Sequence, residues 1–327
     1  MARDLHGHGL SAGSENELMP LGLDRHPTVP EGASLGEGYE GSTPEVLAGL
    51  RDAGALIWVA HTEEKTPEWL RRVEPDGLEL YNLHANVDPR IRTESLGLEA
   101  APFLPDLLEF TRAAARLAPD LAVMTFLDPN RVALARWDEL LAEGTRVAAS
   151  GGCDAHENAL GMELTDGERA DSYRRMMSWI TNHVLADSRS VADVEAALGA
   201  GRNAAVVEVF GTPVGFDFHA AMDADTWEMG DSAPLGSTLV VGVPRVDAGH
   251  PQDPAPSISA RLLRATAGGA VEVARATEGE LRFEPSEPGA YRVEVRIVPH
   301  HTAPFLGSLA RLVRELPWVH SNAIHVE

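Results

Sequence analysis

Short apolar runs and amphipathic segments alternate along the first part of the chain, up to Gly201. An apolar run bounded by glycine and polar residues suits a buried parallel strand, whereas a helical spacing of apolar residues indicates a helix. We predict strands at residues 55–60, 78–81 and 145–149. We predict helices at residues 45–53, 103–117, 132–142, 173–186 and 191–200. Strands that alternate with helices indicate an α/β layered or barrel fold.

The pattern changes near Gly201, where short alternating segments replace the helices. We predict strands at residues 204–210, 238–243, 259–265, 281–284 and 291–298. Turn residues such as those at 285–289 separate these strands. Short strands at this spacing suggest an antiparallel sandwich.

A chain of 327 residues is long enough for two domains. We expect an α/β domain at residues 1–205 and an all-β, sandwich-like domain at residues 212–327. The boundary should lie between Gly201 and Gly215. We expect one short helix within the second domain, at residues 307–314.

The net charge of −23 makes duplex nucleic acid or an anionic membrane surface a poor partner. An anionic small substrate would need a local cation, which a bound metal ion supplies. The single cysteine, Cys153, excludes an internal disulfide. No apolar run is long enough to predict a membrane span, and the first residues lack the apolar core of a signal peptide. These features assign no cellular location.

Three polar clusters, which we expect at strand ends, contain the residue types that bind metal ions: residues 4–8, 61–64 and 154–156. Catalytic groups in parallel α/β folds collect at the C-terminal ends of strands. Imidazole and carboxylate groups are the ligands of hydrolytic Zn, Mn or Fe centres. Alternate residues of an extended strand face the same way, so His6 can act with His8, and Asp154 with His156. The predicted metal ligands are His6, His8, His61, Asp154 and His156.

Other polar residues near these strand ends are candidates for lining the site. His84 lies just past the strand at 78–81, although an ordinary loop histidine has the same pattern. Glu79 lies within that strand and either binds metal or orients its neighbours, and Glu63 follows His61. Each pattern alone also occurs on protein surfaces, and His61 alone also suits a buried structural histidine. The combination favours a metal site.

The helix at 132–142 and the strand after it lead to Gly151-Gly152-Cys153-Asp154-Ala155-His156. This arrangement resembles the late segment of PHP (polymerase and histidinol phosphatase) domains, which carries a Gly-x-Asp-x-His ligand motif. Residues 56–61 resemble the strand before the family's His-Pro motif, and residues 77–82 resemble the next strand. Residues 194–202 resemble a Leu-x-x-Gly-Arg segment of the family, and residues 317–324 resemble its Ser-Asn-Pro-Ile ending. The resemblance covers most of residues 45–327.

The resemblance implies a distorted β/α barrel that holds more than one metal ion and hydrolyses phosphoesters. It implies that His61, Asp154 and His156 are ligands. The expected fold is therefore a PHP-type distorted β/α barrel, complete or partial, followed by the all-β, sandwich-like domain.

The chain departs from the family pattern in two places. Thr62 stands where the family has a proline, and the stretch between His8 and His61 is too short for the family's Thr-Asp-His and Gly-x-Glu strands. Either Asp4-Leu5-His6-Gly7-His8 opens a shortened domain, or residues 1–23 match a later strand and the N-terminal part of the domain is missing. On the second reading several ligands are absent, so we expect poor hydrolysis of a generic aryl phosphate.

On these grounds we expect a metal-dependent hydrolase, a phosphoesterase that uses metal-activated water on a small phosphorylated substrate. Its cofactor would be a divalent ion of Zn, Mn or Fe. The alternative is a non-catalytic or degenerate PHP domain joined to a β-sandwich that binds glycan, peptide or envelope material. Hydrolysis of a non-phosphate bond by a similar site is a third option. Tightly bound metal favours the enzyme, and a stable metal-free fold favours the binding module.

Overall fold

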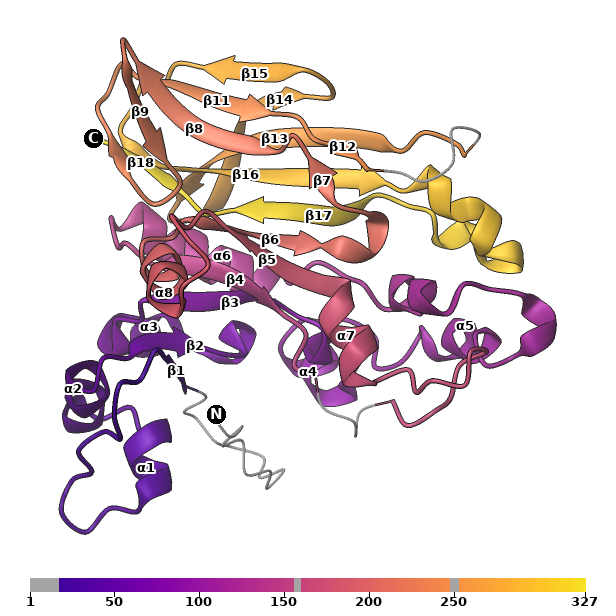
Figure 1. The fold of residues 1–327 in the computed structure, drawn as a ribbon, viewed down its shortest axis with the longest axis horizontal. Coiled ribbons are helices and arrows are strands. Elements are labelled where there is room, and N and C mark those ends of the chain that lie inside the picture. Colours follow the sequence, from indigo (N-terminus) through magenta and orange to yellow (C-terminus); the bar gives the residue numbers. More distant parts are fainter. Residues whose placement is uncertain (1–17, 156–159, 248–252) are drawn as a thin grey trace.

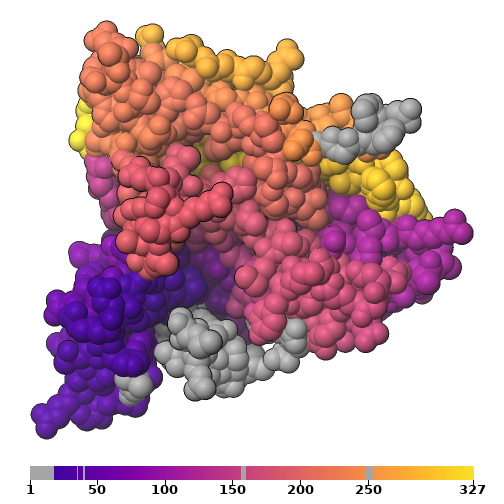
Figure 2. Space-filling view, viewed as in Figure 1, coloured from indigo at the N-terminus to yellow at the C-terminus, as the bar shows by residue number. Residues whose placement is uncertain are grey.

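The computed structural model describes residues 18–155, 160–247 and 253–327. Over these residues the protein is a mixed α/β structure with several sheets (Figure 1). The indigo N-terminal part forms a lobe at the lower left of the space-filling view, below the orange part of the chain (Figure 2). Within the described ranges, we find no helix with the length and apolar character that a membrane crossing requires.

The first sheet is open and has the order β1-β2-β3-β4. Its strands are β1 (Leu18–Leu21), β2 (Leu56–Val59), β3 (Gly77–Asn82) and β4 (Ala148–Gly152). β1 is antiparallel to β2, whereas β2, β3 and β4 run parallel. β3 is buried along its whole length, as a central parallel strand should be. The described residues form no closed barrel, so the barrel part of the expected fold is not confirmed.

The helices around this sheet begin at polar caps. Thr43 and Thr66 each accept a main-chain N–H three residues ahead, and each precedes a proline whose fixed φ suits the first turn. Asn130 caps α6 in the same way, and α6 contacts both β3 and the long strand β13 (Ser257–Thr266) of the next sheet. The elements are α1 (Leu35–Glu40), α2 (Pro44–Asp52), η1 (Thr62–Glu64), α3 (Pro67–Val73), η2 (His84–Asn86) and α6 (Arg131–Ala142).

The connection between β3 and β4 is a long excursion at the right of Figure 1. It contains α4 (Pro89–Glu94), α5 (Leu104–Glu109), η3 (Ala113–Ala115) and η4 (Pro119–Thr125). The helix predicted at 103–117 is therefore too long. The carbonyl of Phe110 accepts the N–H of Thr165, and this tertiary hydrogen bond replaces the bond that would continue the helix.

The helix predicted at 173–186 is wrong in its second half. The segment after β4 contains α7 (Tyr173–Trp179), β5 (Ile180–Val184), α8 (Val191–Gly199) and β6 (Asn203–Val207). β5 pairs with β6 along its full length, in antiparallel register. Its β-branched residues Ile180, Thr181 and Val184 suit a strand, and the ladder with β6 decides in favour of it.

The second half of the chain forms two facing sheets, as Figure 1 shows. The larger has eight strands in the order β10-β18-β16-β17-β6-β5, with β13 on the other side of β16 and β14 beyond it. The smaller has the order β15-β11-β8-β9. Apolar side chains from both sheets, including Phe218, Val241, Val293 and Trp318, share one core. This arrangement agrees with the expected all-β second half.

The strands that follow β6 along the chain are β7 (Pro213–Val214), β8 (Asp217–Met222), β9 (Asp225–Glu228), β10 (Ser232–Ala233), β11 (Thr238–Gly242), β12 (Arg245–Val246), β13 (Ser257–Thr266), β14 (Gly269–Ala276), β15 (Glu280–Phe283), β16 (Gly289–Val298), β17 (Leu316–Ser321) and β18 (Ile324–Val326). β7 and β12 pair separately. Short helical turns are η5 (Glu208–Phe210), η6 (His300–Phe305) and η7 (Gly307–Leu312). β6 pairs with β17, so the two predicted domains share a sheet, and their boundary at 205–212 stays a prediction.

Asparagine side chains bind the edge of β4 that faces away from β3. The N–H of Ala149 donates to Asn322 Oδ1 at 2.7 Å, and its carbonyl accepts from Asn322 Nδ2 at 3.0 Å and Asn203 Nδ2 at 2.8 Å. Gly151 forms a matching pair with the Asn182 amide, at 2.9 and 2.8 Å. These amides therefore join the first sheet to the eight-stranded sheet.

A buried ion pair makes a second connection. Arg292 of β16 donates through Nε and Nη2 to both carboxylate oxygens of Asp138 in α6, at 2.7 and 2.9 Å. Beyond Arg292 lie the buried side chains of Glu294 and His320, with His320 Nδ1 3.9 Å from Glu294 Oε2. Burial lowers the pKa of His320 to about 4, although the charge of Glu294 opposes this shift. His320 is therefore neutral in the folded protein near pH 7.

We predict that Asn322→Ala lowers the free energy of unfolding by roughly 2–3 kcal/mol, because it leaves the buried N–H of Ala149 without its acceptor and removes the donor to the carbonyls of Ala149 and Asn203. Asn182→Ala is the comparison, since its bonds to Gly151 are only partly buried and should contribute about 1 kcal/mol. Urea denaturation measures both values. Equal losses for the two variants would contradict this ranking.

We also predict that His320 makes the fold sensitive to mild acid. Its folded pKa of about 4 lies below the ordinary value of 6.5, so the unfolded chain binds the proton first and stability falls as pH drops from 6.5 towards 4. Over this pH range the free energy of unfolding of His320→Gln should fall by about 3 kcal/mol less than that of the wild type. Urea denaturation at pH 7, 5.5 and about 4 tests this. His325 has a similarly lowered pKa and stays in both proteins, so part of the decline remains in the variant. Parallel pH profiles would contradict the prediction.

Candidate metal centre

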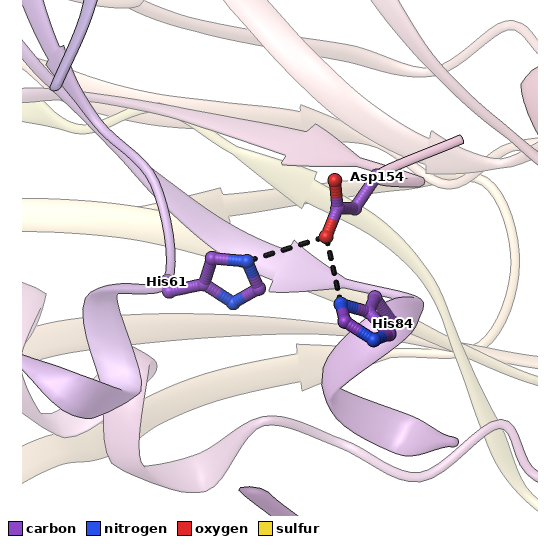
Figure 3. A group of neighbouring side chains, drawn as sticks. All are labelled: His61, His84 and Asp154. Carbon is purple, nitrogen blue, oxygen red and sulfur yellow. Dashed lines mark hydrogen bonds and ion pairs between the residues drawn. The ribbon is translucent and has the colours of Figure 1, made fainter. Parts of the chain in front are cut away.

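Three ligand-type side chains lie just past the ends of three neighbouring parallel strands. His61, His84 and Asp154 each follow by two residues the last residue of β2, β3 or β4. Parallel strands end at the same edge of a sheet, so the three side chains point toward one another there (Figure 3). The regular strand pairing thus assembles this group from segments far apart in the sequence.

Asp154 lies between the two histidines. Its Oδ2 atom is 2.9 Å from His84 Nδ1 and 3.3 Å from His61 Nε2. One ligand atom from each residue lies within 4.8 Å of the other two. Ligands that share a tetrahedral zinc ion lie roughly 3.4 Å apart, since each is about 2.1 Å from the metal. The spacing of the three side chains therefore fits a single divalent ion.

The two histidines also set the charge of Asp154. Burial by itself would raise the pKa of this carboxyl group, but the hydrogen bonds and charges of His61 and His84 lower it far below its ordinary value. Asp154 is therefore ionised over the physiological pH range. An anionic carboxylate between two imidazoles is a donor set that Zn, Mn and Fe accept.

The backbone at two of the three residues adopts the left-handed conformation. The φ angle is 47° at His61 and 43° at Asp154, and neither residue is glycine. Such conformations cost roughly 1–3 kcal/mol each and persist where the surrounding structure enforces them. They occur often at functional sites, and here they turn both side chains toward the common point.

Glu63 orients His61 from behind. Its Oε1 atom lies 3.2 Å from His61 Nδ1, and its Oε2 atom accepts the amide N–H of Asn130 at 2.9 Å. Burial would raise the pKa of Glu63, but the hydrogen bond and charge of His61, together with hydrogen bonds from the main chain and Asn130, lower the net pKa. The contact at Nδ1 leaves the other ring nitrogen of His61, Nε2, directed to Asp154.

Glu79 lies deeper, within β3. Its Oε2 atom accepts the main-chain N–H of His61 at 3.3 Å and the side-chain N–H of Asn82 at 2.7 Å. Burial raises the pKa of Glu79 to about 7, although His61 and Asn82 act against this shift. Both predicted lining glutamates thus contact His61, one at its ring and one at its main chain.

The structure brings together two of the predicted ligands and one residue predicted only to line the site. His61 and Asp154 converge, and His84 takes an equal place beside them. The sequence alone gives little signal for this role, because the predicted strand ends at residues 60, 81 and 149 place the three residues at unequal spacings, and only the observed ends make the spacing equal. The other predicted ligands lie outside the described residues: His6, His8 and His156.

Comparison with known proteins adds no assignment. No model of a known protein family matches this chain, and a search of curated proteins finds no match either. The resemblance to PHP domains therefore rests on the motifs themselves and stays a prediction.

Proposed function

We propose that this protein is a metal-dependent hydrolase that acts on a phosphoester. The observation that carries the proposal is the convergence of His61, His84 and Asp154 from three strand ends. Two imidazoles and one carboxylate are the protein ligands of many hydrolytic zinc sites, in which a fourth position stays open for water. Residues of this kind, gathered at this edge of a parallel sheet, favour a catalytic centre over a structural one.

The chain's own residues supply the positions and charges that such a reaction needs. Asp154, held anionic by its two histidines, and the imidazoles of His61 and His84 would hold one ion of Zn, Mn or Fe. Such an ion, when bound, supplies activation of water and neutralises charge on a phosphoryl group. Glu63 keeps the ring of His61 in a fixed orientation.

The net charge of the chain means that an anionic substrate would need the metal ion in order to bind. A protein with a charge of −23 repels a free phosphate ester, so a local cation is needed to bind one. The ionised carboxylates of Asp154 and Glu63 make the metal-free site acidic, which favours a divalent cation over a phosphate.

The first prediction from this proposal concerns binding of the ion. Metal-free wild-type protein should bind Zn²⁺ in calorimetric titration, and His84→Ala should weaken binding at least about tenfold, because one of three ligands is lost. His219→Ala is the matched control, because His219 also pairs with an aspartate, Asp217, but lies on β8 of another sheet. Wild-type protein without measurable affinity for Zn²⁺ or Mn²⁺ would refute the proposal and favour the non-catalytic binding module.

The second concerns turnover. We expect slow hydrolysis of para-nitrophenyl phosphate that requires added Mn²⁺ or Zn²⁺, because the described residues provide ligands for one ion rather than a cluster. Asp154→Asn should reduce the rate at least about a hundredfold, since it removes the anionic ligand. Asp217→Asn, which changes an exposed aspartate paired with a histidine elsewhere, should leave the rate unchanged. Metal-independent turnover, or turnover unaffected by Asp154→Asn, would contradict the mechanism.

A further inference from the structure

We infer that Glu79 and Asn82 are positioning residues that hold the main chain of both histidine ligands, an inference that rests on the proposed metal centre. Both belong to β3, the strand between the two that lead to His61 and Asp154. Both are buried, so their polar groups need partners within the protein. They find these partners at the ligand-bearing turns.

Glu79 fixes the turn that carries His61. One oxygen, Oε2, accepts the main-chain N–H of His61 at 3.3 Å. This N–H belongs to a residue in the left-handed conformation, with φ at 47°, which needs support from its surroundings. The Glu79 carboxylate supplies that support from the neighbouring strand.

Asn82 passes the same support to His84. Its side-chain N–H donates to Glu79 Oε2 at 2.7 Å, and its Oδ1 atom accepts the main-chain N–H groups of His84 at 2.8 Å and Ala85 at 3.3 Å. A continuous series of hydrogen bonds therefore runs from the backbone of His61, through the buried side chains of Glu79 and Asn82, to the backbone of His84. It sets the relative positions of the two imidazoles.

The other oxygen of Glu79 meets the strand that leads to Asp154. A Cβ atom on Gly152 would lie 1.8 Å from Glu79 Oε1, so only glycine leaves room for the carboxylate here. Gly152 ends β4, two residues before Asp154. Glu79 thus touches each of the three ligand-bearing segments, directly or through Asn82.

We assign to Glu79 a role that depends on the position of its oxygen atoms and not on its charge. Its Oε2 atom is already engaged by two N–H donors, and in the described part of the chain Glu79 is not among the side chains that converge as metal ligands. A glutamine has one oxygen that can accept both of these N–H groups, whereas an aspartate keeps the charge but is shorter. Glu79→Gln therefore removes the charge and keeps the side-chain length, whereas Glu79→Asp keeps the charge and shortens the side chain.

The test compares Glu79→Gln with Glu79→Asp in calorimetric titration with Zn²⁺. Glu79→Gln should bind within about threefold of the wild type, because the same acceptor remains. Glu79→Asp should bind about 10–100-fold more weakly, as expected when a supporting residue behind a ligand is lost. The control is Glu294→Asp, a buried carboxylate of the eight-stranded sheet, which should not alter the affinity. An affinity that follows charge, with Glu79→Gln weak and Glu79→Asp tight, would overturn the inference.

Amide hydrogen exchange in the metal-free protein provides a readout that does not depend on metal. The N–H groups of His61 and His84 should exchange faster in Glu79→Asp than in the wild type, and at the wild-type rate in Glu79→Gln. If Glu79→Asp does not fold, Glu79→Gln still tests the inference, because faster exchange of these N–H groups in Glu79→Gln would contradict it. If the wild type binds no metal, the proposed function fails, while this exchange pattern still decides whether Glu79 holds the two turns.

Discussion

The outer edge of β4 is the constraint on which the arrangement of the sheets depends. A strand paired on one side leaves buried main-chain groups on the other, and each one without a partner costs about 1–3 kcal/mol. In this protein the missing strand is replaced by the amides of Asn182, Asn203 and Asn322, each of which carries both a donor and an acceptor. They come from β5, from β6 and from the residue after β17, so the bonds that complete β4 also attach the eight-stranded sheet.

The candidate metal centre depends on the same strand. β4 leads to Asp154, and its other edge pairs in parallel with β3, which leads to His84. With β4 held on both edges, Asp154 is placed against the two histidines, and its left-handed backbone is tolerated. Strain of this kind in a well-supported turn is typical of residues that must present a side chain to a ligand.

The places where sequence-based prediction failed have a common physical origin. The helix predicted at 173–186 gives way to a strand because β6 offers a full ladder to Ile180–Val184, and the helix predicted at 103–117 ends where Phe110 bonds to Thr165. Both outcomes depend on partners distant along the chain, which local periodicity cannot report. The expected barrel, complete or partial, is not confirmed, since the described strands form an open sheet whose last edge is met by side chains.

The sequence by itself determined the apolar runs that become β2 and β3, the alternation of strands and helices, the β-rich second half, and the imidazole and carboxylate groups that follow the strands. These are local properties, because the pattern of apolar residues and the chemistry of each side chain depend only on residues close together in the sequence. Only the tertiary structure decided that His84 joins His61 and Asp154, and that Glu79 and Asn82 lie behind them. The reason is that strand order, register and backbone direction at the turns arise from contacts between distant segments.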